Sequence, residues 1–154
     1  MSRAPFQVLV FPFRKNRHGN FEYAIFKRLD EPYWQSIAGG GEDNELPIEA
    51  AKREAYEEAN IPVSAEYFSL KTIASIPVYH FTARNVWPKD QYVIPGYYFA
   101  VDSSNIEMAL SYEHTAYQWV TYETGAKWLC WDSDKTALWE LKERLLNDDL
   151  PLPA

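Results

Sequence analysis

The sequence predicts a mixed α/β fold in a single domain. Several segments rich in aromatic and β-branched residues are bounded by turns, a helix rich in alanine and glutamate interrupts them, and further helices follow the last of them. A chain of 154 residues is long enough for one substantial core and too short for two comfortable domains. We therefore expect one domain over residues 1–147 and a loose tail over 148–154, which contains two prolines.

The predicted strands lie on both sides of a glycine run. The first strand is expected to stop at Pro12, where a polar turn begins. A short later strand leads directly into Gly39-Gly40-Gly41, and Pro95-Gly96 indicates a bulge or a close approach within another strand. The expected strands cover residues 6–11, 21–27, 34–37, 68–76, 92–101 and 117–120.

The first predicted helix follows the glycines. Pro47 suits its first turn, and Asn44 is the expected N-cap because Leu46 is a poor capping residue. At its end, Asn60 is expected to adopt a left-handed conformation. A stripe of small and apolar residues would let the helix lie close to a sheet, and it consists of Ile48, Ala51, Ala55 and Ala59.

Two more helices are predicted near the end of the chain. A short one opens at Thr121, and the run Asp132-Ser133-Asp134 is expected to cap a longer one. In the longer helix, Leu138, Leu141 and Leu145 recur at helical spacing, while charged residues fill the other face. We expect this helix to cover the sheet.

Three carboxylates crowd one arc of the first helix. Glu54, Glu57 and Glu58 stand at i, i+3 and i+4, directly after Arg53. A glutamate-rich helix is more often simply solvated, but like charges at this spacing repel unless a divalent cation neutralises them. Oxygen ligands suit Mg²⁺ or Mn²⁺, and the flexible glycines upstream would let a backbone carbonyl approach the same cation.

The spacing of these residues resembles the Nudix box, Gly-x5-Glu-x7-Arg-Glu-apolar-x-Glu-Glu-x-Gly-apolar. Gly39 and Glu45 open the motif, Arg53 to Glu58 supply its charged centre, and Asn60 replaces the closing glycine. Every charged position is present. The resemblance implies the Nudix α/β/α sandwich with a mixed central sheet, and it implies that Arg53 orients Glu45 and the metal-binding carboxylates.

Segments outside the box are similar to one bacterial subgroup of this family, the dihydroneopterin triphosphate and dATP pyrophosphohydrolases. These segments are Trp34-Gln35-Ser36-Ile37, Glu113-His114 with the aromatic residues after it, and Trp131-Asp132-Ser133. Many Nudix enzymes bring a distal glutamate to the metal. Glu113 matches that position, with Glu107 as its rival.

The resemblance implies Mg²⁺-dependent hydrolysis of a nucleoside or pteridine triphosphate to a monophosphate and pyrophosphate. Either Glu54 or Glu113 would be the general base. Two alternatives stay open, namely an enzyme acting on ADP-ribose or a dinucleoside polyphosphate, and an inactive nucleotide-sensing domain. The implied metal ligands are the carbonyl of Gly39 and the carboxylates of Glu54, Glu57, Glu58 and Glu113.

Substrate contacts are expected from residues beside the loops at the strand ends. Arg28 would contact phosphate, although an exposed surface arginine explains it equally well. One or two aromatic rings would stack on a base or pterin, and simple packing is the competing interpretation. The candidates for stacking include Trp34, Phe81 and Trp131.

Composition excludes some partners. A net charge of −7 argues against general binding to nucleic acid or anionic membranes. A single cysteine, Cys130, fits a reducing cytoplasm and is expected to be a buried apolar residue. The sequence shows neither a membrane span nor a signal peptide, and no pattern in it indicates an oligomeric state.

Overall fold

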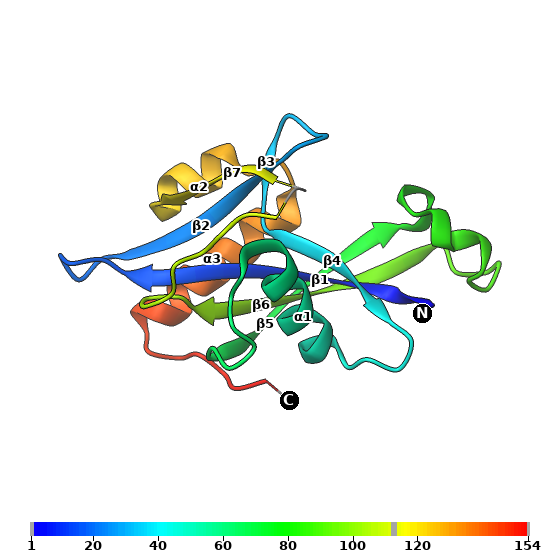
Figure 1. Ribbon diagram of the computed structural model, residues 1–154, viewed down its shortest axis with the longest axis horizontal. Coiled ribbons are helices and arrows are strands. Elements are labelled where there is room, and N and C mark those ends of the chain that lie inside the picture. Colours follow the sequence, from blue (N-terminus) through cyan, green and yellow to red (C-terminus); the bar gives the residue numbers. More distant parts are fainter. Residues whose placement is uncertain (1, 112–113, 154) are drawn as a thin grey trace.

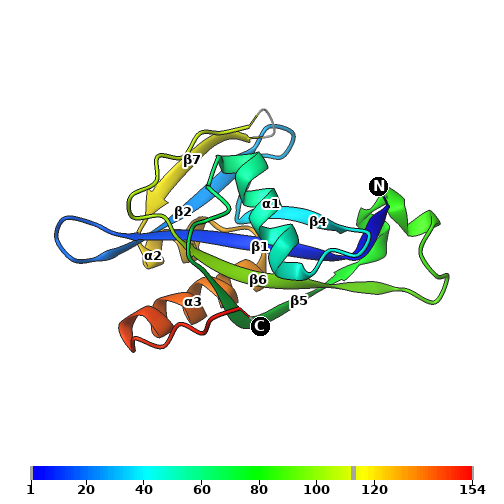
Figure 2. The same ribbon diagram turned by 60° about the horizontal axis from the view of Figure 1, so that its bottom comes forward.

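A seven-stranded mixed sheet lies between helices on both of its faces (Figure 1). The structure, a computed structural model, describes residues 2–111 and 114–153. Helix α1 (Pro47–Ala59) covers one face, and α2 (Tyr122–Trp128) and α3 (Asp132–Leu146) cover the other (Figures 1 and 2). The predicted α/β sandwich with a mixed sheet is confirmed.

The sheet follows the order β3-β2-β1-β6-β5, with β4 paired to β1 and β7 paired to β2. Strands β1 and β6 are parallel, and the other pairs are antiparallel. The strands are β1 (Arg3–Lys15), β2 (Phe21–Arg28), β3 (Trp34–Gln35), β4 (Ile37–Glu42), β5 (Tyr67–Pro77), β6 (Val93–Asp102) and β7 (His114–Val120).

Strand β1 continues through Pro12, so the expectation that it stops there is wrong. On one side β1 pairs with β4 as far as Val10 and with β2 from Phe13 onwards. Pro12 therefore stands where one neighbouring strand gives way to the other, a place where a missing backbone donor is tolerated. Its other neighbour, β6, pairs with β1 along the whole of this stretch.

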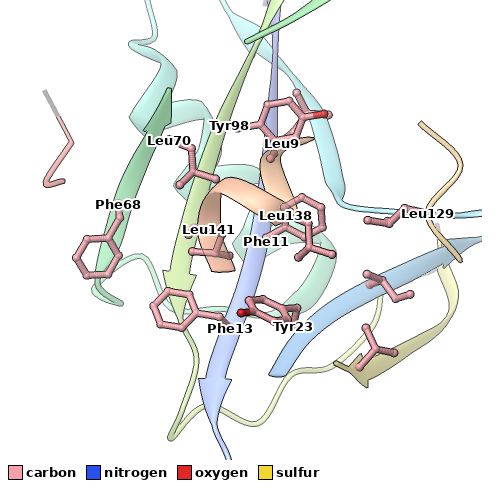
Figure 3. Close-up of a cluster of buried hydrophobic side chains, with 14 of the residues drawn as sticks. Leu9, Phe11, Phe13, Tyr23, Phe68, Leu70, Tyr98, Leu129, Leu138 and Leu141 are labelled. Carbon is pink, nitrogen blue, oxygen red and sulfur yellow. The ribbon is translucent and has the colours of Figure 1, made fainter. Parts of the chain in front are cut away.

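Alternating residues of β1 build a separate core on each face. Val8 and Val10 pack beneath α1 together with its buried alanines. Leu9, Phe11 and Phe13 pack on the opposite face, where Leu138 and Leu141 of α3 cover them (Figure 3). The leucine spacing of the last helix therefore predicted its buried side correctly, with Leu145 packed at the edge.

Helix α1 begins with an unusual cap. The N-cap is Leu46, whose N–H donates to Glu49 Oε1 at 2.7 Å, so Asn44 is not the cap. The Glu49 carboxylate, in the first turn, thus provides the acceptor for the backbone N–H of the N-cap residue. At the other end Asn60 has φ 57° and ψ 33°, which confirms its predicted left-handed conformation.

Helix α3 begins directly after Trp131, so the run Asp132-Ser133-Asp134 forms its first turn and does not cap it. Asp134 is instead fully buried. Cys130, just before the helix, is exposed, which contradicts its expected burial. Leu129, the residue before it, takes the buried position.

Strand β5 carries the irregularity that was expected in β6. Pro95 and Gly96 pair regularly with β5, whereas the register shifts between Ser69 and Ile73. Gly96 does provide a close approach, since a Cβ there would lie 2.8 Å from Leu9 Cδ1. Glu140 of α3 reaches the shifted segment and accepts bonds from the N–H groups of Lys71, at 2.6 Å, and Thr72, at 2.8 Å.

The segment between β5 and β6 contains two short 3-10 helices, η1 (Val78–His80) and η2 (Thr82–Asn85). It lies at the end of the molecule away from α2 and α3 (Figure 2). In the described part of the tail, Pro151 accepts a bond from the Ser69 N–H at 3.2 Å. No helix in the described part of the chain is long and apolar enough to cross a membrane.

Candidate active site

The carboxylate of Glu54 lies directly against Gly39. A Cβ on Gly39 would stand 2.0 Å from Glu54 Cδ, so any other residue there would displace the Glu54 carboxylate. The glycines were expected to fold the backbone tightly, but Gly39 and Gly40 are extended residues of β4 paired with β1. Gly39 is therefore required for close approach and not for an unusual backbone conformation.

Arg53, in the middle of α1, connects this helix to β4 and to the turn between them. Its Nε and Nη2 donate to the two carboxylate oxygens of Glu45 at 2.8 and 3.0 Å, and Nη2 also donates to the Gly40 carbonyl at 2.7 Å. Nη1 donates to Glu54 Oε1 at 2.9 Å and only weakly to Glu57, at 3.4 Å. The arginine thus holds Glu45 and Glu54 in fixed positions relative to the glycine strand.

The three crowded carboxylates differ in burial. Glu58 is 2% exposed, the Glu54 side chain 14%, and the Glu57 side chain 54%. Burial raises the pKa of Glu54, although hydrogen bonds with Glu58 and Arg53 act in the opposite direction. Glu54 and Glu58 therefore form a buried carboxyl pair, in which burial disfavours the ionised form of Glu54.

His114, at the start of β7, lies behind this pair. Its Nε2 is 3.5 Å from Glu58 Oε1, and its ring packs against Phe26. A nearby carboxylate would raise the pKa of a histidine, but burial, with Arg28 as a second cause, lowers the pKa of His114 to about 4. The imidazole is therefore neutral at neutral pH and can donate or accept a hydrogen bond.

A cavity of about 650 Å³ opens on the other face of the sheet, next to the N-terminus of α3. The side chains of Tyr33, Phe81 and Trp131 line it, and so does Arg28, which is ion-paired with Asp30 at 2.9 Å. Trp34 does not line it. The ring of Trp34 packs on Trp128 and on the core.

The floor of this cavity contains a buried carboxylate that the sequence interpretation missed. Asp134 accepts bonds from the Ser36 N–H at 3.0 Å, the Ser36 hydroxyl at 3.2 Å and the Tyr98 hydroxyl at 2.6 Å. Burial raises its pKa. The available signal was position, because an aspartate four residues before Leu138 lies on the buried stripe of the helix.

Known proteins resemble this chain over nearly its whole length. A model of the NUDIX domain matches residues 7–139. The chain belongs to the Nudix family. A protein from Listeria monocytogenes, described as a Nudix hydrolase, has 45% sequence identity and a TM-score of 0.88, with 97% of this chain and 100% of that chain covered. The comparison with curated proteins finds no match.

More distant solved structures share the fold. The dihydroneopterin triphosphate pyrophosphohydrolase of E. coli has a TM-score of 0.73 at 21% identity, covering 96% of this chain and 99% of that one. The Ap4A hydrolase of C. elegans has a TM-score of 0.72 at 18% identity, covering 94% and 99%. The present protein is a Nudix hydrolase, an enzyme of the class that cleaves phosphoric anhydride bonds.

Nudix hydrolases generally use divalent metals, and the residues around Gly39 fit such an ion. Glu54 and Glu58 offer hard oxygen ligands whose mutual repulsion a cation would relieve. Among the described residues, no three acidic, histidine or cysteine side chains already stand together as a metal site. Glu57 is half exposed and bonded to Arg53, and Glu113 lies outside the described residues.

Proposed function

We propose that this Nudix hydrolase is a Mg²⁺-dependent pyrophosphohydrolase that cleaves a nucleoside or pteridine triphosphate to a monophosphate and pyrophosphate. The observation that carries the proposal is the buried Glu54–Glu58 pair against Gly39. A buried pair of carboxyls at a glycine backbone suits a divalent cation and the phosphates that it would bind. The aromatic cavity on the other face of the sheet suits a flat ring.

In this proposal the metal ligands are the carboxylates of Glu54, Glu57, Glu58 and Glu113 and the carbonyl of Gly39. When bound, the ion lowers the pKa of water and neutralises phosphate charge. Arg53 holds Glu54 in place and Glu45 fixes Arg53. The general base in this proposal is either Glu54 or Glu113.

The cavity supports a ring-binding role for two of the aromatic residues expected from the sequence. Phe81 and Trp131 both line it, and Tyr33 stands edge-on to Trp131 with ring centroids 5.3 Å apart. A cavity of about 650 Å³ has the size of typical small-molecule sites. Arg28 lines the same space, and we propose that it contacts a polar group of the substrate.

The substrate is tested by a panel. Purified protein with Mg²⁺, or with Mn²⁺, is offered nucleoside triphosphates, dihydroneopterin triphosphate, ADP-ribose and dinucleoside polyphosphates, and the release of pyrophosphate and phosphate is measured. Pyrophosphate released from triphosphates is the expected result. Preferential cleavage of ADP-ribose or of a dinucleoside polyphosphate would favour the first alternative function, and binding without cleavage would indicate a sensing domain.

The distal ligand is tested by two variants. Glu113→Gln is expected to lower turnover or metal affinity clearly, because the proposal makes it a ligand. Glu107→Gln is expected to change little, since Glu107 is exposed in the segment after β6. The reverse pattern in metal titrations of the two variants would assign the distal position to Glu107.

The proposal also places the enzyme in the cytoplasm, without nucleic acid as a partner. A single cysteine and a net charge of −7 support these two points. Fractionation of the source cells, and a binding assay with duplex and single-stranded DNA at low salt, test them. A protein found outside the cytoplasm, or submicromolar binding to DNA, would contradict them.

A further inference from the structure

Arg3 lies beside the cavity and contacts Gly40 of β4, whereas Glu54 contacts the preceding residue, Gly39. A Cβ on Gly40 would stand 2.1 Å from Arg3 Cζ, so the guanidinium rests directly on the glycine. From the other direction, Arg53 Nη2 donates to the Gly40 carbonyl. The guanidinium groups of Arg3 and Arg53 therefore both contact Gly40. The sequence pattern indicated a role for Arg53 only.

The Arg3 side chain is held rigidly by neutral groups. Nη1 donates to the carbonyls of Ala4, at 2.5 Å, and Phe6, at 2.7 Å, and Nη2 donates to Gln7 Oε1 at 2.5 Å. The ring centroids of Phe81 and Trp87 lie 5.2 and 5.7 Å from Cζ. Two of these neighbours, Gln7 and Phe81, also line the cavity.

No carboxylate of the described residues forms an ion pair with Arg3, whereas Arg14, Arg28, Arg53 and Arg144 all have one. Burial lowers its pKa, and Glu54 is near enough to act in the opposite direction. A half-buried charge that has only neutral partners is costly. An arriving anion would offset that cost, and a guanidinium is well shaped to receive a phosphate.

We propose that Arg3 binds the phosphate chain of the substrate where the chain passes from the aromatic cavity to the carboxylate site. This inference rests on the proposed function. It assigns a specificity role to a residue outside the Nudix box. It also explains Gly40, because any side chain there would displace the guanidinium.

The test compares Arg3→Gln and Arg3→Lys with Arg14→Gln. Arg14 is a matched control, since it lies in the same strand and its Cζ is 4.2 Å from the ring centroid of Trp119. Unlike Arg3, it forms an ion pair, with Glu22, and it does not line the cavity. Titration calorimetry in chelator measures the binding of inorganic tripolyphosphate, of a nucleoside α,β-methylene triphosphate and of the corresponding nucleoside. Thermal melting confirms that each variant is folded.

Arg3→Gln is expected to weaken both phosphate ligands by about tenfold or more, because charge-assisted hydrogen bonds are lost, and to leave nucleoside binding unchanged. Arg3→Lys, which keeps the charge without the planar fork, should lie between Arg3→Gln and the wild type. Arg14→Gln should match the wild type. Equal tripolyphosphate affinity in all four proteins, or none in the wild type, would overturn the proposal.

The two proposals can fail separately. If the wild-type enzyme cleaves no triphosphate but tripolyphosphate binding depends on Arg3, the proposed function fails and the anion site stands. If triphosphates are cleaved and Arg3→Gln has wild-type KM and kcat, the anion site fails alone. If Arg3→Gln does not fold, Arg3→Lys decides, since wild-type affinity for both phosphate ligands in that variant would contradict the need for a guanidinium.

Discussion

Each face of the sheet buries a carboxyl group, but the neighbouring groups differ between the two faces. Beneath α1, Glu54 lies beside a second carboxyl, Glu58, and accepts a bond from Arg53. Beneath α3, Asp134 accepts bonds from three neutral donors of Ser36 and Tyr98. Burial raises the pKa of both Glu54 and Asp134. The cost of burial is thus similar in kind, but only Asp134 is surrounded by donors alone.

This difference separates two roles for buried acids. A carboxylate whose oxygens are satisfied by hydroxyl and amide donors stabilises the fold and has little left to offer a ligand. A carboxyl that stands against another carboxyl is unfavourable until a cation neutralises the pair, which is why we propose a binding role for it. Substitutions on the two faces should therefore change different measurements.

The largest expected effect is on catalysis beneath α1. Glu58→Gln should keep the fold and lower kcat by about 10²-fold or more at saturating Mg²⁺, because it removes the charge of a proposed metal ligand at constant volume. Steady-state kinetics over a Mg²⁺ titration measures the loss. Near-wild-type turnover would show that Glu58 is not a metal ligand. The proposed difference in role between the carboxyls beneath α1 and Asp134 would then fail.

The second effect is on stability beneath α3. Asp134→Ala should lower the free energy of unfolding by about 2 kcal/mol or more, because it leaves the donors of Ser36 and Tyr98 buried without an acceptor. Ser36→Ala, which removes one hydroxyl, should cost about 1 kcal/mol. Urea unfolding measures both. If Asp134→Ala unfolds like the wild type, the hydrogen bonds of Asp134 contribute nothing to stability.

The third effect is a pH dependence of stability at Glu54. Since burial raises the pKa of Glu54 above its usual 4.5, the folded protein holds that proton more tightly than the unfolded chain does. The resulting stabilisation is present below the unfolded pKa and is lost as the pH rises through the folded value. In chelator, Glu54→Gln should therefore gain stability over the wild type as the pH is raised from acid to neutral.

Unfolding curves at several pH values measure this gain. Glu57→Gln is the control, because its carboxyl is half exposed and should show a much smaller change. A stability difference between Glu54→Gln and the wild type that stays constant with pH would mean that Glu54 ionises as freely as an exposed glutamate.

The smallest effect concerns the end of α1. Asn60→Gly should be neutral or slightly stabilising, since φ is 57° there, and Asn60→Val should cost about 1 kcal/mol from steric strain. Thermal melting of the two variants compares them. Equal stabilities would contradict the left-handed conformation.

The sequence predicted the fold where spacing is the deciding signal. The alanine stripe, the leucine period and the left-handed Asn60 all follow from local geometry, and all are confirmed. Interactions between distant segments could not be read in the same way. Pro12 continues a strand because its neighbouring strand changes, and Trp34 faces the core because Trp128 packs on it.

The site shows the same division. The Nudix spacing predicted the Arg53–Glu45 bond, which is confirmed, because these residues are grouped along one helix and the turn before it. Asp134 accepts bonds from Ser36, 98 residues earlier in the chain, and Arg3 lies over the ring of Phe81, which belongs to the segment between β5 and β6. Only the folded sheet brings such residues together.

Glu140 has a consequence for how the molecule behaves among its own copies. Strand β5 is the last strand of the sheet order, so its outer edge could recruit another chain by strand addition. Hydrogen bonds from Lys71, Thr72 and Arg144 lower the pKa of Glu140 even though burial alone would raise it. The carboxylate therefore stays ionised at neutral pH and accepts bonds from two N–H groups of β5. Those two groups are then not available to pair with a strand of another copy in concentrated solution.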